Sequence, residues 1–194
     1  MDASTGLCAN GRIRISFASD AKGLGAFAAT ALCADEDVGA YNGEVLTFGQ
    51  LLSRYGDAGG CDSPSEYEAA NAQAAWIAER TSRGVGVTGQ YIFNAGKCPT
   101  SRRALLLDAE DPLHSNWTRF LNHSSRRPNL LVARALEGEG DAPHAAADGG
   151  ASSGGGGGGV PTVRFVAARA IEEGEELLFD YGEGLELELL GFEE

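Results

Sequence analysis

The sequence predicts a mainly β fold with an inserted pair of helices, and three patterns support this prediction. Apolar and polar residues alternate in several short segments, of which Ile13 to Phe17 is the first. Two helix start signals follow one another between residues 47 and 83. Strands do not alternate with long crossover helices, which argues against a Rossmann-type sheet. With 194 residues, 43% of them hydrophobic, residues 1–194 suit one domain with one core.

Short strands are expected along most of the chain. After the first strand, a turn at Ala21 to Gly25 leads into the apolar run Ala26 to Ala29. The segment Val38 to Leu46 predicts a strand pair or one bent strand, in which Gly39 and Gly43 allow a bulge or a close backbone approach. Further strands are expected at residues 90–94, 104–108, 130–136, 162–168 and 177–179.

Two capping boxes predict the helices of the insert, residues 47–83. The first helix begins after Thr47, with Gln50 as its capping partner, and the second begins after Ser63, with Glu66 in the same role. Apolar spacing then predicts which side of each helix faces the core. The expected apolar faces are Phe48, Leu51, Leu52 and Tyr55 in the first helix, and Tyr67, Ala70, Ala74 and Ile77 in the second.

Two segments differ from the rest in composition. Residues 137–159 are rich in Gly, Ala and Asp and end in six glycines, so a flexible surface loop is expected there. The tail, residues 183–194, is acidic with interspersed leucines and forms either a short amphipathic helix or a frayed end. The formal net charge of −13 disfavours direct nucleic-acid binding. An acidic surface would attract Lys-rich peptide tails, and the equally weighted alternative is that it only maintains solubility.

The cysteines and the apolar segments bound the location and the chemistry. Four cysteines are widely spaced without a CxxC pair, so no metal site is expected. They are instead expected to be free, mostly buried thiols in a reducing compartment. No apolar stretch is long enough to cross a membrane, and the first residues lack the pattern of a signal peptide. These features predict an intracellular protein without membrane contact.

Two polar segments are candidates for carrying chemistry. Asn116 to Asn129 (NWTRFLNHSSRRPN) mixes core-type residues with hydrogen-bonding side chains. Ala170 to Gly182 (AIEEGEELLFDYG) ends in a tyrosine that can direct its hydroxyl into a cleft. Each segment alone also fits a structural role, as a hydrogen-bonded histidine or a tyrosine packed at a sheet rim. A hydrolase built on Ser124, His123 and Asp180 is a weaker alternative, because the G-x-S-x-G elbow is missing.

Taken together, the motifs resemble the SET-domain family of protein-lysine methyltransferases. KGLGAFA (22–28) is similar to the family's G-x-G strand and turn, and YNGE (41–44) to its Y-x-G-E segment. NWTRFLNHSSRRPN resembles the RF-NHS-x-PN motif, and the run ending in GEELLFDYG resembles the closing GEEL and DYG elements. The similarity extends from about Ile13 to Gly182. It implies a SET-type fold of small β-sheets whose C-terminal segment threads beneath a loop to form a pseudoknot.

The resemblance also implies a cofactor, a substrate and a set of site residues. The cofactor is S-adenosylmethionine (SAM), and the substrate is a lysine side chain of a protein. Tyr181 and Tyr41 are the implied catalytic residues, and Tyr41 and Phe179 line the implied lysine channel. Phenylalanine at position 179, where the family has Phe or Tyr, leaves room to add more than one methyl group. The implied cofactor-binding residues are Lys22, Leu24, Tyr91, Asn122, His123 and Tyr181.

Two departures from the family pattern bear on the function. Ser125 stands where many members have cysteine, and the cysteine-rich flanking modules are missing, so the tail or a partner must close the lysine channel. These departures motivate an alternative, a catalytically silent SET-like interaction module. The retained residues Tyr181, Asn122, His123 and Tyr41 disfavour it. The acidic charge suits a basic histone tail as substrate, and ribosomal or other proteins fit equally well. A histone substrate makes a nuclear location more favourable than a cytoplasmic one.

Overall fold

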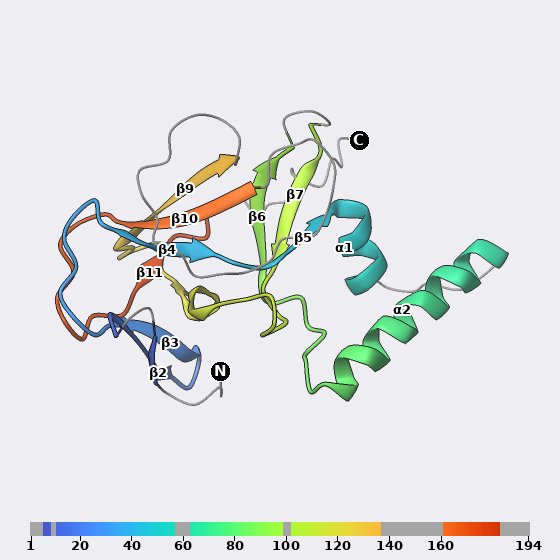
Figure 1. Cartoon of the computed structure of the whole chain (residues 1–194), viewed down its shortest axis with the longest axis horizontal. Helices are drawn as coiled ribbons and strands as arrows, with labels where there is room; N and C mark the ends of the chain where they lie inside the picture. Colours follow the sequence, from blue (N-terminus) through green and yellow to red (C-terminus); the bar gives the residue numbers. More distant parts are fainter. Residues whose placement is uncertain (1–5, 9–10, 57–62, 99–101, 137–160, 183–194) are drawn as a thin grey trace.

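The mainly β architecture is built from three small sheets, from one side of which two helices extend (Figure 1). The predicted fold class, mainly β with inserted helices, is therefore confirmed. The flexible loop expected at 137–159 and the acidic tail expected at 183–194 lie outside the described residues. The computed structural model describes residues 6–8, 11–56, 63–98, 102–136 and 161–182.

The first sheet is antiparallel and joins the start of the chain to its end. It contains β1 (Gly6–Cys8), β2 (Ile13–Ser19) and β3 (Gly23–Ala28) in that order. Strand β3 begins inside the segment that was expected to be a turn, because Gly23 adopts a φ of +70° and the chain reverses before it. Single bridges, Phe27 to Glu176 and Leu32 to Ile171, then connect this sheet to the C-terminal segment.

The other two sheets form the centre of the molecule. One has three antiparallel strands in the order β5-β7-β6 and the other has five in the order β4-β10-β9-β11-β8. Among the described strands, the pairings of β11 with β8 and with β9 are parallel and the others are antiparallel. The bounds are β4 (Asp37–Tyr41), β5 (Glu44–Thr47), β6 (Ile92–Lys97), β7 (Ala104–Asp108), β8 (Asn122–His123), β9 (Leu130–Leu136), β10 (Pro161–Ala167) and β11 (Leu178–Phe179).

The segment Val38 to Leu46 divides between these two sheets. Strand β4 pairs with β10, whereas β5 pairs with β7, so the segment forms neither a hairpin nor one bent strand. Gly43 lies where the chain passes from one sheet to the other. A Cβ atom at Gly43 would lie 2.8 Å from the backbone oxygen of Asp108, closer than real Cβ atoms approach. The close backbone approach predicted for this glycine is thus confirmed.

Both predicted helices are present with their capping boxes. Helix α1 (Phe48–Tyr55) follows Thr47, whose hydroxyl accepts the amide hydrogen of Gln50. Helix α2 (Pro64–Ser82) follows Ser63 in the same way, with Glu66 as the reciprocal partner. A short 3₁₀ helix, η1 (Trp117–Phe120), was not expected and precedes β8.

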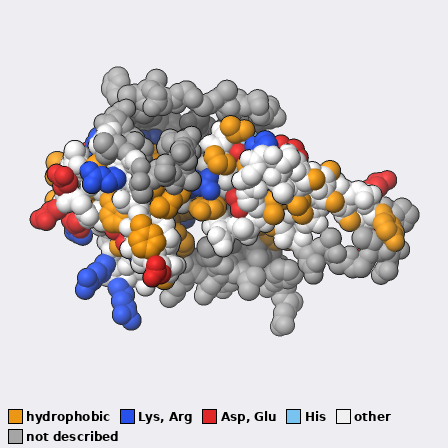
Figure 2. All heavy atoms as spheres, turned by 90° about the horizontal axis from the view of Figure 1, so that it is seen from below, with side chains coloured by type: hydrophobic (Ala, Val, Ile, Leu, Met, Phe, Trp, Pro, Cys, Tyr) orange, Lys and Arg blue, Asp and Glu red, His pale blue; other side chains and the backbone are white. Residues whose placement is uncertain are grey.

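The predicted apolar faces of the helices are partly wrong. In α1, Leu52 is 53% exposed, although the other three predicted residues are partly buried. In α2, Tyr67, Ala74 and Ile77 are exposed, and Figure 2 shows hydrophobic side chains along the outer surface of this helix. The face turned toward the body carries Ala70, Gln73, Trp76 and Arg80 instead.

The inward face of α2 differs from the prediction because buried carboxylates below the helix require cations. Arg80 is 2% exposed, and its Nη2 lies 3.3 Å from a carboxylate oxygen of the fully buried Asp108. The Tyr55 hydroxyl donates to Asp108 at 2.7 Å, and Arg54 pairs with Glu44 at 2.5 Å. We call these five residues the insert network. Apolar spacing could not reveal a helix face that is held by charges.

Strand β11 lies between β8 and β9, which are consecutive in the chain. Leu178 pairs with Asn122 on one side, and Phe179 pairs with Leu130 on the other. The connection from β8 to β9, residues 124–129, therefore has to cross β11. This sheet order is what the expected pseudoknot requires, and the threading itself stays a prediction.

The core fills the space between the sheets. Its largest fully buried side chains include Phe165, Ile13, Leu46 and Ile171. Of the two cysteines whose side chains are described, Cys33 is exposed and Cys98 half-buried, so the expectation of mostly buried thiols is wrong for Cys33. Among the described residues, no helix is long and apolar enough to cross a membrane.

Candidate functional site

A cavity of about 620 Å³ lies where the ends of several strands meet. Strands β3, β4, β6, β8, β9 and β11 and the helix η1 all contribute to its wall. The structure brings seven of the eight predicted site residues to this wall and leaves His123 outside it. The seven are Lys22, Leu24, Tyr41, Tyr91, Asn122, Phe179 and Tyr181.

Aromatic rings form one part of the cavity. The Phe93 ring lies 5.0 Å from that of Tyr41 and 5.7 Å from that of Phe179, and the Phe179 ring lies 4.6 Å from that of Tyr181. Behind them, Phe165 packs on Phe179 with ring centroids 4.9 Å apart. These side chains come from β4, β6, β10 and the end of β11, so only the folded sheet assembles them. We call Tyr41, Phe93, Phe179 and Tyr181 the aromatic end.

Two tyrosine hydroxyls of the aromatic end are fixed by backbone carbonyls. Tyr41 donates to the oxygen of Tyr91 at 2.8 Å, and Tyr181 donates to the oxygen of Leu121 at 3.0 Å. Burial, with Tyr181 nearby, raises the pKa of Tyr41 far above its usual value, although Arg119 partly opposes this. Burial also raises the pKa of Tyr181. Both hydroxyls therefore stay protonated at neutral pH and present fixed oxygen atoms to the cavity.

The opposite part of the cavity is polar. The Asn122 amide donates to the backbone oxygen of Leu24 at 3.1 Å and to the Glu176 carboxylate at 2.9 Å. Lys22 pairs with the other oxygen of the same carboxylate at 3.1 Å. A Cβ atom at Gly25 would lie 3.0 Å from the side chains of Asn122 and Glu176, so a glycine there lets them approach β3. We call Lys22, Leu24, Asn122 and Glu176 the polar end.

His123 lies next to the cavity and supports it from outside. Its Nδ1 accepts the amide hydrogen of Tyr181 at 3.1 Å, and the two rings are 5.0 Å apart. Because Nδ1 accepts a hydrogen, the imidazole is in the Nε2-protonated form in this arrangement. His123 therefore positions the backbone of Tyr181, whereas its side chain is not among those that line the cavity.

The arrangement gives no support to a hydrolase. The Ser124 hydroxyl accepts the amide hydrogen of Arg127 at 3.1 Å, and within the described residues it has no hydrogen bond to His123. The Nδ1 atom of His123 lies 3.8 Å from Asp180, beyond hydrogen-bonding distance. In the part of the chain that is described, no three His, Cys, Asp or Glu side chains are grouped as metal ligands would be.

The site residues predicted from the sequence do not include several at or beside the cavity, and four of these have a clear part in it. Phe93 and Arg134 line it, and Arg119 lies with its guanidinium carbon 4.2 Å from the Tyr91 ring centroid. Glu176 holds two of the predicted residues together. The spacing Tyr91-x-Phe93 in a strand was a usable signal for Phe93, because alternate residues share one face. Arg119 and Glu176 lie inside the RF-NHS and GEEL motifs, which gave a local signal but no role for them. Arg134 depends on contacts between distant segments, which leave no local pattern.

Asn129 links the β8–β9 connection to the strand that it crosses. Its amide donates to the backbone oxygen of Glu176 at 2.9 Å, and its side-chain oxygen accepts the amide hydrogen of Leu178 at 2.8 Å. The side chain is 1% exposed, so both bonds form out of water. Asn129 thereby fixes the position of β11 and of the aromatic residues that follow it.

Comparison with known proteins agrees with this geometry. A sequence model of the SET domain matches residues 23–182, most of the chain. The chain belongs to the SET-domain family. The kind of activity that the family represents is protein-lysine methyl transfer. No curated protein matches the chain.

Two solved structures illustrate the likeness. The crystal structure of CpSET8 from Cryptosporidium has a TM-score of 0.50 and 21% sequence identity, covering 87% of this chain and 56% of that one. It supports the SET-type fold, and this chain spans about half of its length. KRYPTONITE, in complex with mCHG DNA and SAH, has a TM-score of 0.48 and 22% identity, covering 84% of this chain and 22% of that one.

Proposed function

We propose that this protein is a SAM-dependent protein-lysine N-methyltransferase. The observation that carries the proposal is that one cavity combines an aromatic end, with two fixed tyrosine hydroxyls, and a polar end built on Lys22, Leu24 and Asn122. An aromatic wall suits the methylene chain of a lysine, and a polar wall suits an amino-acid and nucleoside cofactor. Membership of the SET-domain family supports the same assignment.

The cavity fits a cofactor of the size and polarity of SAM. Its volume of about 620 Å³ lies in the range of roughly 300–1,000 Å³ that is usual for small-molecule sites. The Nε of Arg119 is buried and has no hydrogen-bond partner among the described residues, so a donor is available at the wall. Lys22, Leu24, Asn122 and Tyr91 would hold the cofactor. When bound, SAM would supply a methyl group activated by its sulfonium.

The surroundings favour the neutral amine that methyl transfer requires. Deprotonating an ordinary lysine at pH 7 costs about 4.6 kcal/mol. The aromatic end lowers this cost, because an apolar channel disfavours the ammonium form. The positive charge of Arg119 acts on the Tyr41 hydroxyl and would disfavour an ammonium there as well. The lysine proton can then leave to water, so no dedicated base is required.

The two tyrosines orient the reacting groups. The oxygens of Tyr181 and of the Leu121 carbonyl lie 3.0 Å apart at the aromatic end and give the amine a fixed set of partners. Tyr41 provides the same kind of pair with the Tyr91 carbonyl. Phe179 contributes no hydroxyl, which leaves space beside the amine. We therefore include the addition of more than one methyl group in the proposal.

The substrate protein is proposed at two levels. A lysine of a protein is the general substrate of the proposed reaction. A histone tail is the specific candidate, and a nuclear location belongs to this part of the proposal. Methylation of purified histones and of whole-cell extract with labelled SAM, analysed by mass spectrometry, gives the substrate, the modified lysine and the number of methyl groups. Cell fractionation checks the location.

Tyr181→Phe tests the mechanism. Loss of the orienting hydroxyl is expected to lower kcat by about a hundredfold. Affinity for S-adenosylhomocysteine, measured by calorimetry, is expected to change by less than about threefold, since the ring remains in place. Tyr67→Phe is the matched control, because Tyr67 is 59% exposed on α2 and far from the cavity. Equal methyl incorporation by wild type and Tyr181→Phe would remove Tyr181 from the mechanism.

The cofactor test also separates the enzyme from a silent SET-like module. An enzyme binds SAM and S-adenosylhomocysteine in calorimetry at micromolar to millimolar concentration and transfers methyl groups. A silent module binds neither at millimolar concentration, in which case the proposed activity is wrong. Binding of the cofactor without transfer to any lysine in whole-cell extract would leave the cofactor assignment standing and refute the enzyme.

A further inference from the structure

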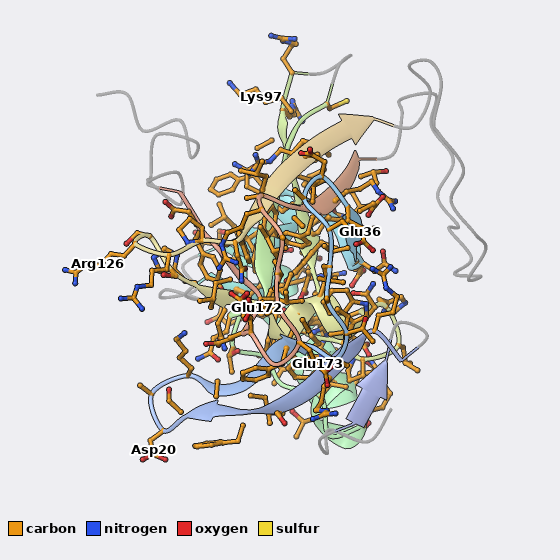
Figure 3. The ribbon with its side chains drawn as sticks, turned by 90° about the vertical axis from the view of Figure 1, so that its left-hand side faces the viewer. Asp20, Glu36, Lys97, Arg126, Glu172 and Glu173 are labelled. Carbon is orange, nitrogen blue, oxygen red and sulfur yellow. The ribbon has the colours of Figure 1, made fainter. Side chains whose placement is uncertain are left out.

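The charge of the chain is divided unevenly between its described body and the rest of the sequence. Of the 28 Asp and Glu residues, 12 lie outside the described residues, which leaves 16 within them. All 15 Lys and Arg residues lie within the described part. Side chains of both signs project from this body, such as Asp20, Glu36, Lys97 and Arg126 (Figure 3). Within the described residues the charges therefore nearly balance, with 15 positive and 16 negative side chains.

Among the described residues, every charged side chain that lines the cavity is a cation. These side chains are Lys22, Arg119 and Arg134. Lys22 is neutralised by Glu176 at the polar end. Arg134 has its Nε bound to the backbone oxygen of Asn94 at 3.1 Å, and no described carboxylate forms an ion pair with it. This hydrogen bond fixes the arginine, and its two terminal nitrogens have no hydrogen-bond partner among the described residues.

Arg134 is an exposed side chain next to the aromatic end. Leu130, Val132 and Arg134 share one face of β9, because alternate residues of a strand point to the same side. Along this face the exposure rises from the buried Leu130 to the exposed Arg134. The guanidinium carbon of Arg134 lies 5.6 Å from the ring centroid of Phe93. The ring centroid of Tyr41, which belongs to the aromatic end, lies 5.0 Å from the same Phe93 centroid. One ring therefore separates the proposed lysine channel from an arginine that has no acidic partner among the described residues.

We propose that Arg134 selects substrates in which an acidic group lies within about two positions of the target lysine. The inference rests on the proposed function and defines its substrate class. Adjacent residues of an extended peptide advance by about 3.3 Å, so a neighbouring side chain can cross the width of Phe93. A guanidinium with two free nitrogens binds carboxylate or phosphate in a forked geometry. The occupant is an aspartate, a glutamate or a phosphorylated side chain.

Peptides that differ in one flanking residue test this selection. Glu, Gln or Lys is placed at each of the two positions on both sides of a single lysine, and kcat/KM is measured with the full chain. At one or more positions, the Glu peptide is expected to exceed the Gln peptide by roughly three- to tenfold, and the Lys peptide to be the poorest. A phosphoserine peptide distinguishes the two anion sources: values above those of the Glu peptide favour phosphate, and values below favour carboxylate.

Variants of Arg134 show whether this residue causes the preference. Arg134→Gln is expected to make the Glu and Gln peptides equal, and Arg134→Glu to reverse the order in favour of the Lys peptide. A purely structural role would lower all peptides together and would not reverse their order. Arg164→Gln is the matched control, because Arg164 lies on the neighbouring strand β10 and pairs with Asp37 away from the cavity.

Binding measurements separate this inference from the proposed function. Fluorescence anisotropy with the same labelled peptides requires no methyl transfer. A preference for the Glu peptide that Arg134→Gln removes would support the inference even if no methyl is transferred. Methyl transfer with equal kcat/KM for the Glu, Gln and Lys peptides would overturn the inference and leave the enzyme standing. A preference that persists in Arg134→Gln and Arg134→Glu would also overturn it.

Discussion

The insert network and the cavity both place polar groups inside the protein, and they differ in how those groups are used. In the insert network, arginines, carboxylates and a tyrosine bind one another, as in the contact of Arg80 with Asp108. At the aromatic end, the tyrosine hydroxyls are held by backbone carbonyls and still border an open space. Polar groups that satisfy one another attach the helices to the sheet, whereas polar groups fixed beside a cavity can meet a ligand.

The two regions also touch, through Glu110. Its buried carboxylate accepts hydrogens from the amides of Thr88 and Gly89, and its backbone oxygen accepts a hydrogen from Arg119 at 3.0 Å. The Tyr55 hydroxyl of the insert network lies 3.1 Å from the same carboxylate. Residues 88 and 89 immediately precede the segment that contains Tyr91. Glu110 thus connects the packing of α1 to the wall of the cavity.

Removal of Arg80 is expected to have the largest effect on the insert network. Arg80→Met leaves the buried Asp108 with only the more distant Arg54, 3.8 Å away, as a cation among the described residues, which is expected to lower the free energy of unfolding by about 3 kcal/mol. Urea unfolding of the full chain measures this change. The exposed pair of Arg164 with Asp37 provides the matched control, and Arg164→Met is expected to cost less than about 1 kcal/mol. Equal losses in the two variants would contradict the structural role assigned to Arg80.

Asn122→Ala tests the polar end of the cavity. The variant loses the hydrogen bonds to Leu24 and Glu176, so affinity for S-adenosylhomocysteine is expected to fall by about tenfold, equivalent to about 1.4 kcal/mol. Calorimetry measures the affinity. Asn116→Ala is the control, because Asn116 caps η1 and does not line the cavity, so the variant should lose stability and keep its affinity. An unchanged affinity in Asn122→Ala would place the cofactor elsewhere.

Phe179→Tyr is expected to change the product more than the stability. The added hydroxyl occupies the space beside the amine, so mass spectrometry should show fewer methyl groups per lysine. The extra atom in a site with 3% exposure should cost less than about 1.5 kcal/mol in urea unfolding. Tyr67→Phe again serves as the control. The same distribution of methyl states in both proteins would mean that Phe179 does not set the number.

The dependence of stability on pH should distinguish Glu44 of the insert network from Tyr41 of the aromatic end, with smaller changes than those above. Tyr55 of the insert network adds to the alkaline change, because burial raises its pKa as well. The hydrogen bond from Arg54 lowers the pKa of Glu44, so its contribution to stability is present above the unfolded pKa near 4.5 and is lost as the pH falls through the folded pKa. Burial raises the pKa of Tyr41, so its contribution is present below pH 10 and is lost as the pH rises above that value. Urea unfolding at acid and alkaline pH measures both limbs.

Variants test which residue contributes to the loss of stability at acid pH and which contributes to the loss at alkaline pH. Glu44→Gln should weaken the loss of stability in acid and leave the alkaline loss unchanged. Tyr41→Phe should do the reverse. If Glu44→Gln alters the alkaline limb instead, the assignment of the two limbs is wrong.

Much of the local structure was predictable because it depends on neighbours in the chain. The capping box at Thr47 sets the start of α1, and the short apolar run in Ala104–Asp108 predicts β7 with the bounds that the structure has. The inward face of α2 was not predictable, because Arg80 is buried only where Asp108 lies beneath it. Burial of a charge is decided by its partner, and the partner here is 28 residues away along the chain.

The sequence by itself determined the family, most of the strand and helix segments and seven residues that line the cavity, because their motifs are local and their order is specific. Only the tertiary structure decided that His123 supports Tyr181 from outside the cavity and that Arg119 and Arg134 line it. The physical reason is that hydrogen bonds and ion pairs join groups by distance in space, and the order of residues fixes that distance only after the sheets have formed.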